Sequence, residues 1–332
     1  MRMMRMLSAL VGASIALAGA ASAQTLIVLN KSDHEAALVN PATLEVTARL
    51  GTGKGPHEVA VSADGRMAYV SNYGSYGVFR PGEQRQQPGE TITVLDLKAR
   101  KVAATWKLDA FKRPHGIVVS RDGKRLWVTV EENKAVLEIE TSSGKIVKSW
   151  KTEQETSHMV EPTWDEKKLF VTNIRSGSVK VINRTTDEVK TIVTAAGTEG
   201  VAISPDGKEV WVTNRGANTI SVIDSTTDTV KETFDSGGKM PIRVKFTPDG
   251  KEVLVSNAQS NMVSVFNAKT RALLAKIEVG VVPVGIQMTP DGKRAFVANT
   301  NANKVSVIDI AARKVAQTFE TGQEPDGMAW AK

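Results

Sequence analysis

The stretch SPDGKEVWVTNRGANTISVIDSTTDTVKETF, residues 204–234, is one copy of a unit that recurs along the chain. Two later copies, TPDGKEVLVSNAQSNMVSVFNAKTRALLAKI (247–277) and TPDGKRAFVANTNANKVSVIDIAARKVAQTF (289–319), match it nearly position by position. Each copy contains four short runs rich in Val, Ile and Thr, separated by Asp-Gly, Asn or Gly turn signals. Each copy is therefore expected to form four short strands joined by turns.

The repeat continues upstream with drift, and its period is near 42 residues. A period of this length with four strands per unit is typical of a β-propeller, in which each unit forms one blade around a central channel. Seven runs precede the Asp-Gly turn or its equivalent, and by the logic of a propeller each is the innermost strand of its blade. These runs are HEVAVS (57–62), HGIVVS (115–120), HMVEPTW (158–164), EGVAIS (199–204), IRVKFT (242–247), VGIQMT (284–289) and DGMAWA (326–331). We therefore predict an all-β, seven-bladed propeller with four antiparallel strands per blade.

The two ends of the chain carry incomplete units. The chain begins with three strand-like runs, LIVLN (26–30), AALVN (36–40) and EVTARL (45–50), and it ends on the inner-strand run 326–331. Together these four runs make one complete blade. The N-terminal strands are thus expected to pair with the C-terminal strand, which closes the ring and leaves no exposed sheet edges.

The second and third runs of each unit carry a recognisable signature. The runs AYVSN, LFVTN, VWVTN, VLVSN and AFVAN are each followed by ITVLD, VKVIN, ISVID, VSVFN or VSVID. In these runs, and over almost the whole chain after the leader, the sequence resembles the YVTN-type propeller repeat family. That resemblance implies the propeller fold, but it does not select a function, because such propellers include binding proteins, lactonase-like enzymes and lyases.

Composition limits the class of protein further. Residues 1–23 combine Arg2 and Arg5, an apolar Ala-rich run and the small residues Ala21-Ser22-Ala23, which predicts a cleaved secretory signal. Residues 24–332 are then expected to form a single exported propeller domain, periplasmic or secreted, monomeric and without a membrane span. The chain has no cysteine, which excludes disulfides, thiolate ligands and a haem attachment motif. Its formal charge of +7 is scattered, and no pattern favours nucleic acid or a nucleotide cofactor.

One segment interrupts the repeat. Residues 74–90, GSYGVFRPGEQRQQPGE, lengthen the first unit by about 16 residues and are rich in Gly, Pro, Gln and aromatic residues. We expect a loop between the second and third strands of blade 1. It is either a tolerated surface insertion or a lid over the channel mouth, since loops of this kind lie on the face where the inner strands begin.

The most informative departure from the repeat lies at the start of the inner strands. In ring order, the residues entering them are Asp326, His57, His115, His158, Glu199, Ile242 and Val284. Five consecutive positions therefore carry carboxylate or imidazole groups at one mouth of the channel. The fourth histidine, His34, lies in a loop predicted on the same face, and Glu58 and Glu161 lie near in sequence.

Imidazole and carboxylate groups together suit a divalent metal ion such as zinc, manganese, iron, nickel or copper. We predict a metal site at His57, His115, His158, Glu199 and Asp326, with His34, Glu58 and Glu161 as further candidates. The alternative is that a histidine after proline only caps the strand entry by a hydrogen bond.

Three arginines also depart from the repeat. Arg175 and Arg215 occupy the same loop in two adjacent blades, and Arg243 enters blade 5. They either belong to the solvated surface or form a cationic flank for an anionic ligand, because guanidinium groups match carboxylate and phosphate.

Other recurring residues are interpreted as scaffold. The Asn residues that close the second strands are predicted to form turns. They are Asn30, Asn72, Asn173, Asn214, Asn257 and Asn299. Large aromatic residues at one repeated strand position are predicted to pack between blades. They are Trp127, Phe170, Trp211 and Phe296.

Three functions remain open. The first is a protein that binds a metal ion, a small anion or a protein partner on its histidine face. The second is a metal-dependent enzyme, a lyase or a lactone hydrolase, in which the metal polarises a carbonyl and a histidine acts as base. The third is a polyanion or DNA binder, which only the net charge supports.

Overall fold

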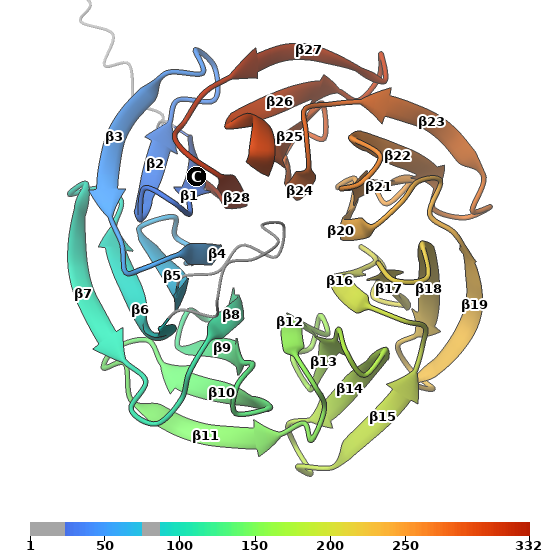
Figure 1. Ribbon diagram of the computed structural model, residues 1–332. Coiled ribbons are helices and arrows are strands. Elements are labelled where there is room, and N and C mark those ends of the chain that lie inside the picture. The colour runs from blue at the N-terminus through green and yellow to red at the C-terminus, as the bar shows by residue number, and fades with distance from the viewer. Residues whose placement is uncertain (1–23, 75–86) are drawn as a thin grey trace, which may run out of the picture.

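The computed structural model describes residues 24–74 and 87–332. In this part of the chain, 28 strands form seven four-stranded antiparallel sheets arranged around a central axis (Figure 1). The predicted seven-bladed propeller is therefore confirmed. The predicted signal, 1–23, lies outside the described residues.

The strands of each blade are listed from the channel outward. Blade 1 contains β4 (Pro56–Val61), β5 (Met67–Gly74), β6 (Pro88–Asp96) and β7 (Lys101–Lys107); blade 2 contains β8 (Pro114–Val119), β9 (Arg125–Val130), β10 (Ala135–Glu140) and β11 (Ile146–Lys151). Blade 3 contains β12 (Ser157–Pro162), β13 (Lys168–Asn173), β14 (Ser178–Asn183) and β15 (Val189–Val193); blade 4 contains β16 (Thr198–Ile203), β17 (Glu209–Asn214), β18 (Thr219–Asp224) and β19 (Thr229–Asp235). Blade 5 contains β20 (Pro241–Phe246), β21 (Glu252–Asn257), β22 (Met262–Asn267) and β23 (Leu273–Glu278); blade 6 contains β24 (Pro283–Met288), β25 (Arg294–Asn299), β26 (Lys304–Asp309) and β27 (Lys314–Phe319). Blade 7 contains β28 (Pro325–Ala331), β1 (Thr25–Asn30), β2 (Glu35–Val39) and β3 (Val46–Gly51), and a short 3-10 turn, η1 (Thr300–Ala302), follows β25.

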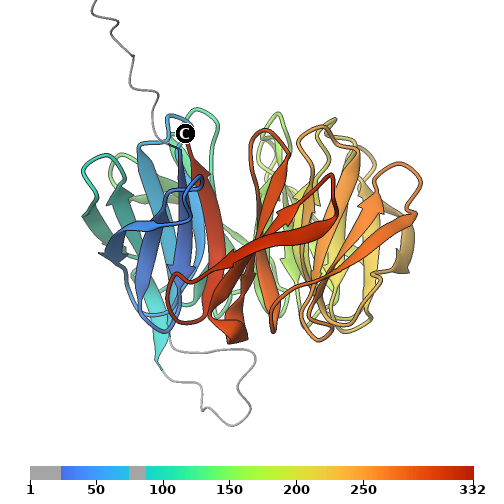
Figure 2. The ribbon, with the colours of Figure 1, turned by 90° about the horizontal axis from the view of Figure 1, so that it is seen from above.

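Blade 7 joins the two ends of the chain, as predicted. β28 pairs antiparallel with β1, with Leu26 opposite Trp330 and Ile27 opposite Ala329. Figure 1 shows β28 on the channel side of β1, and Figure 2 shows the closed ring edge-on. Because β1 gains its inner partner from the far end of the sequence, the ring closes without an open edge at this blade.

The core lies mainly between neighbouring blades. The four large aromatic residues predicted to pack there are fully buried: Trp127, Phe170, Trp211 and Phe296. Trp211 of blade 4, for example, packs against Val244 and Val253 of blade 5. Such aromatic residues bury a large area each and so hold adjacent sheets together, and this prediction is confirmed.

The recurring asparagines have a second role besides the predicted one at turns. All six are fully buried rather than exposed at turns. Asn72 donates to Thr91 Oγ1 at 3.0 Å and to Thr93 Oγ1 at 2.9 Å, and Asn214 donates to Ser221 Oγ at 2.9 Å. A buried amide needs hydrogen-bond partners, so these side chains tie strands within one blade together, while the backbone carbonyls of Asn173, Asn214 and Asn257 accept hydrogen bonds from the turns that follow.

In blades 1 to 5, the hydroxyl residue before the second-strand asparagine, or before its equivalent Val130, links one blade to the next; these residues are Ser71, Thr129, Thr172, Thr213 and Ser256. Thr129 Oγ1 donates to the backbone carbonyl of His158 at 2.6 Å, and Thr213 Oγ1 donates to that of Ile242 at 3.1 Å. These bonds fix the carbonyl groups of the residues at the channel mouth. The repeated Ser or Thr thus positions the candidate site as well as the strand that carries it.

The two ends of the predicted loop at 74–90 differ from the expectation. β5 runs through Gly74 and β6 begins at Pro88, so both ends of that segment belong to strands. Residues 75–86 lie outside the described residues. Within the described part of the chain, none of the helical structure is long and apolar enough to cross a membrane.

Candidate functional site

Each inner strand begins with an irregularity that turns one side chain toward the axis. In blade 2, Pro114 pairs with Val130 and Ile117 pairs with Val128, which leaves His115 and Gly116 outside regular pairing. Equivalent register shifts occur in the other six blades. A β-bulge re-aims side chains in this way and is common beside functional sites.

The side chains that these bulges present make up what we call the entry ring: Asp326, His57, His115, His158, Glu199, Ile242 and Val284. Glycine follows the ring residue in four blades. A Cβ on Gly327 would overlap the carbonyl oxygen of His57, and one on Gly285 would overlap that of Asp326. These glycines let neighbouring inner strands approach closely, which brings adjacent ring residues together.

A second set of residues surrounds the same mouth, and the sequence reasoning missed it. It consists of the residue that follows the second-strand asparagine, or its equivalent, in each blade. This second-strand ring contains Lys31, Tyr73, Glu131, Ile174, Arg215, Ala258 and Thr300. The registration that found the entry ring would have found it too, had it been applied to this position.

The two rings enclose a cavity of about 170 Å³. Five of the seven second-strand residues and all seven entry-ring residues line it, together with Thr156, Arg175 and Arg243. The predicted residues His57, His115, His158, Glu199, Asp326, Arg175, Arg215 and Arg243 thus surround one space. Whether they bind a metal ion or a ligand stays a prediction.

His158 is held between two carboxylates. Its Nδ1 lies 2.6 Å from Glu131 Oε1, and its Nε2 lies 3.4 Å from Glu199 Oε1. Burial alone would lower the pKa of His158, but the hydrogen bonds and negative charges of the two glutamates outweigh burial and raise it. A protonated ring donates from both nitrogens, so these contacts favour the protonated form of His158.

His57 and His115 are neutral. Burial, reinforced by the positive charge of Lys31, lowers the pKa of His57 to about 4. Burial, reinforced by the charge of His158, lowers the pKa of His115 well below its usual value. His57 Nδ1 lies 3.0 Å from the carbonyl oxygen of Gly55, which only accepts, so this nitrogen carries the proton. Nε2 is then the nitrogen that His57 offers to a ligand.

An aromatic row connects these groups. The His115 ring stacks on His158 with centroids 3.6 Å apart, and His57 lies 5.0 Å from His115. Tyr73 packs against His57 at 4.7 Å, and its hydroxyl donates to Glu131 Oε2 at 2.6 Å. Glu131 therefore orients both Tyr73 and His158.

An ion pair beside the cavity spans the channel. Arg243 of blade 5 donates through Nη2 to Glu58 Oε1 of blade 1; the Arg243 side chain is buried, and that of Glu58 is 13% exposed. Glu58, predicted as a possible metal ligand, is engaged here and does not line the cavity. Arg243 Nη1 is buried without a hydrogen-bond partner among the described residues, 3.9 Å from Glu199 Oε1.

Two further ion pairs join the rings. Lys31 Nζ lies 3.0 Å from Asp326 Oδ2, and Arg215 Nη1 lies 2.8 Å from Glu199 Oε2. The other carboxylate oxygen of Asp326, Oδ1, is buried and has no hydrogen-bond partner in the described part of the chain. Among the described residues, the acceptor Asp326 Oδ1 and the donor Arg243 Nη1, both on residues that line the cavity, therefore lack a hydrogen-bond partner.

The remaining arc of the entry ring is apolar. Ile242 and Val284 belong to one buried cluster with Ala258, against which Met240 and Val282 pack. Blades 5 and 6 thus supply an apolar wall opposite the histidines. A wall of this kind favours contact with hydrocarbon rather than with water or an ion.

Besides Glu58, two of the predicted residues lie outside the cavity lining. His34 is not in the cavity lining; its Nδ1 lies 3.2 Å from the backbone nitrogen of Gly55 and 2.9 Å from the carbonyl of Lys31. It holds the turn that leads to His57. Glu161 is also absent from the lining, and burial raises its pKa. Over residues 24–74 and 87–332, no three His, Asp or Glu side chains are grouped so that they could hold a metal ion.

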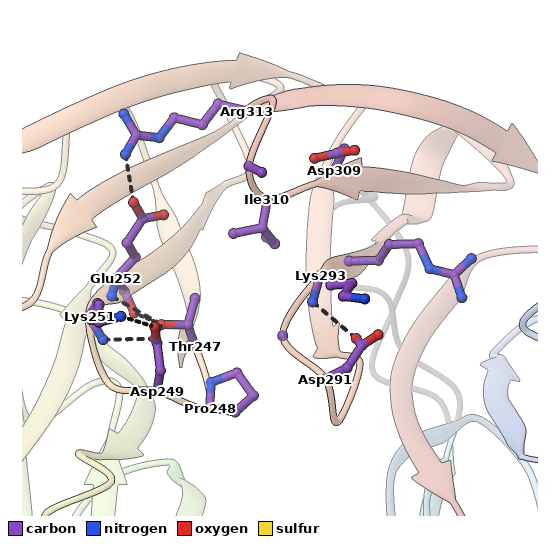
Figure 3. Close-up of a pocket in the computed structure, with 13 residues that line it drawn as sticks. Thr247, Pro248, Asp249, Lys251, Glu252, Asp291, Lys293, Asp309, Ile310 and Arg313 are labelled. Carbon is purple, nitrogen blue, oxygen red and sulfur yellow. Dashed lines mark hydrogen bonds and ion pairs between the residues drawn. The ribbon is translucent and has the colours of Figure 1, made fainter.

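A larger cavity, of about 850 Å³, lies at the turns of blades 5 and 6 (Figure 3). Its charged groups pair with one another, as Arg313 does with Glu252 at 2.6 Å and Lys251 with Asp249 at 3.1 Å. A similar groove recurs between blades 3 and 4. Because it is a repeated feature of the scaffold, it is a weaker candidate than the cavity at the histidines.

The fold and the site define the class: a closed seven-bladed propeller with a polar, histidine-containing cavity at one mouth of its channel. The chain belongs to the YNCE-like beta-propeller family, which it matches over residues 129–290 and 247–332, more than half of its length. No curated protein sequence matches it.

Several solved structures share the fold. Hydrazine synthase of Kuenenia stuttgartiensis has a TM-score of 0.74 at 23% identity, with 86% of this chain and 92% of that chain covered. A functionally unknown protein of Desulfotomaculum acetoxidans has a TM-score of 0.78 at 12% identity, covering 92% and 98%. The dihydro-heme d1 dehydrogenase NirN, solved in complex with DHE, has a TM-score of 0.67 at 17% identity, covering 93% and 66%. At these identities the likeness concerns the fold alone.

Proposed function

We propose that the protein is an exported binding protein that holds a small anionic ligand in the cavity between the two rings. The lining contains four basic side chains, Lys31, Arg175, Arg215 and Arg243, against the carboxylates Glu131, Glu199 and Asp326. The raised pKa of His158 adds positive charge. An anion is therefore favoured over a cation.

The observation that carries the proposal is the state of Arg243. Its guanidinium is buried, Nη1 has no hydrogen-bond partner in the described part of the chain, and the residue lines the cavity. A buried donor without a partner is costly, and a charge-assisted hydrogen bond to an anion removes that cost. A ligand carboxylate on Arg243 Nη1 supplies such a partner.

The test is calorimetric titration of the purified protein with propionate, a small monocarboxylate. Replacing Arg215 by Ala, or Arg243 by Lys, is expected to weaken propionate binding by about tenfold or more, because each removes a charged hydrogen bond. Arg66→Ala is the matched control, since Arg66 is exposed and pairs only with Asp96, away from the cavity. Absence of propionate binding, or equal binding by all variants, would overturn the proposal.

The predicted metal site is tested separately. Zinc and manganese are titrated into wild type and into His57→Ala, His115→Ala and His158→Ala. Loss of metal binding in these variants would support the metal prediction. Metal binding that is unchanged in all three variants would reject the metal prediction. The enzyme and polyanion hypotheses stay predictions, tested by lactone and uronate substrates and by the salt dependence of DNA affinity.

A further inference from the structure

We infer that the ligand is a hydroxy carboxylate with a small apolar substituent, such as 2-hydroxy-4-methylpentanoate. The inference deepens the proposed function and rests on it. It follows from three chemically distinct parts of one cavity: an unpaired donor, a pair of unused acceptors and an apolar wall.

The donor is Arg243 Nη1. Nη2 of the same guanidinium is occupied by Glu58, so the group is fixed in orientation while Nη1 remains free of a hydrogen bond among the described residues. A fixed guanidinium that offers one N–H selects a carboxylate oxygen by direction as well as charge. The carboxylate of the ligand is therefore assigned to this end.

The acceptors are His57 Nε2 and Asp326 Oδ1, from adjacent positions of the entry ring. His57 Nδ1 donates to Gly55, which leaves only a lone pair on Nε2. Asp326 is 3% exposed, its Oδ2 pairs with Lys31, and its Oδ1 has no partner among the described residues. Neither atom can bind a carboxylate, since both only accept. A ligand hydroxyl, which donates one hydrogen, can satisfy one of the two, and we assign it to His57 Nε2.

The apolar wall consists of Ile242 and Val284 on the far side of the ring, supported by Ala258. Neither side chain can hydrogen-bond, so this arc gains only from hydrocarbon. A ligand with charge at one end and a branched alkyl group at the other satisfies all three parts. A simple inorganic anion would leave the acceptors and the apolar wall without partners.

The test compares four compounds by calorimetry on the unmodified protein. 2-Hydroxy-4-methylpentanoate is the reference. 4-Methylpentanoate lacks the hydroxyl and is expected to bind about tenfold more weakly. 2-Hydroxy-4-methylpentanamide lacks the charge and is expected to lose at least about tenfold. Lactate lacks three carbons of the alkyl group and is expected to lose about 50-fold.

Variants assign each preference to its residue. His57→Ala should abolish the preference for the hydroxylated compound over 4-methylpentanoate, whereas Lys304→Ala, at an exposed position outside the cavity lining, should leave it unchanged. Val284→Ala should reduce the preference for 2-hydroxy-4-methylpentanoate over lactate. Val281→Ala is its control, because Val281 is exposed and does not line the cavity.

The outcomes separate the two proposals. If propionate binds but 2-hydroxy-4-methylpentanoate binds no more tightly than 4-methylpentanoate and lactate, this inference is wrong while anion binding stands. If neither propionate nor any of the four compounds binds, the proposed function itself is wrong. If the amide binds as tightly as the acid, the assignment of the carboxylate to Arg243 is overturned.

Discussion

The imidazole rings of His115 and His158 stack with centroids 3.6 Å apart, yet they hold protons differently. His158 contacts Glu131 and Glu199 through its two nitrogens, whereas His115 Nδ1 is buried without a hydrogen-bond partner among the described residues. The positive charge favoured on His158 opposes a second charge on His115. Two side chains at equivalent repeat positions therefore have opposite electrostatic roles.

The first prediction concerns these protonation states. An NMR titration of the histidine rings is expected to show His158 protonated above its usual pKa, while His57 stays neutral down to about pH 4. Glu131→Gln should lower the pKa of His158, because it removes the charge and replaces a carboxylate acceptor at 2.6 Å. A pKa of His158 that is unchanged in this variant would contradict the assignment.

The second prediction is the effect of pH on stability. The pKa of His57 is lower in the folded protein than in the unfolded chain, so the unfolded chain binds more protons between pH 6.5 and about 4. The free energy of unfolding should therefore decrease as the pH is lowered through this window, by about 1.4 kcal/mol per pH unit for one proton. His57→Gln should show a shallower dependence in urea unfolding. Equal slopes in wild type and variant would count against a neutral, buried His57.

The third prediction concerns the ion pair across the channel. Removing one partner, as in Glu58→Gln or Arg243→Met, leaves a buried group unpaired and is expected to cost about 3–5 kcal/mol in urea unfolding. Replacing both partners by Met should cost less than the two single changes together. The exposed pair of Arg66 and Asp96 is the control, and Arg66→Ala should cost less than about 1 kcal/mol. Additive single effects would indicate that Glu58 and Arg243 act independently.

The fourth prediction concerns a glycine between blades. Gly327→Ala forces a Cβ against the carbonyl oxygen of His57 and is expected to destabilise the protein by about 1–3 kcal/mol. Gly51→Ala provides the comparison, because nothing lies within 4 Å of a Cβ at that position, and its effect should stay within about 0.5 kcal/mol. Similar midpoints for both variants in chemical unfolding would show that the close approach of β28 and β4 is not needed.

The fifth prediction concerns ring closure. Deleting residues 324–332 removes β28 with its buried side chains Met328 and Ala331, and it exposes the edge of β1, which carries the buried Leu26 and Ile27. The thermal unfolding midpoint should fall by more than about 5 °C, because the loss affects the whole ring. Deleting Lys332 alone should leave the midpoint unchanged. An unchanged midpoint after the longer deletion would refute closure by this strand.

The sequence was sufficient to predict the architecture, because strand-forming runs and turn residues follow one another in the same order in each repeat. Some buried residues, such as Trp211 and Val253, pack between blades. Their positions recur with the repeat period, which predicts the number of blades and the register of the strands. The same registration placed His57, His115 and His158 at one mouth. It did not reveal that His158 is held by Glu131, because Glu131 contacts it from another blade and another ring.

The repeat period alone therefore determined the fold, the closure of blade 7 and the common location of most candidate residues. Only the tertiary structure decided how these residues are engaged: Glu58 and Arg243, 185 residues apart, meet across the channel, while His34 turns away to support Gly55. The physical reason is that strand order and burial are local properties that recur in every repeat. Proton positions and unpaired polar atoms, in contrast, depend on which side chains the closed ring brings within hydrogen-bond distance.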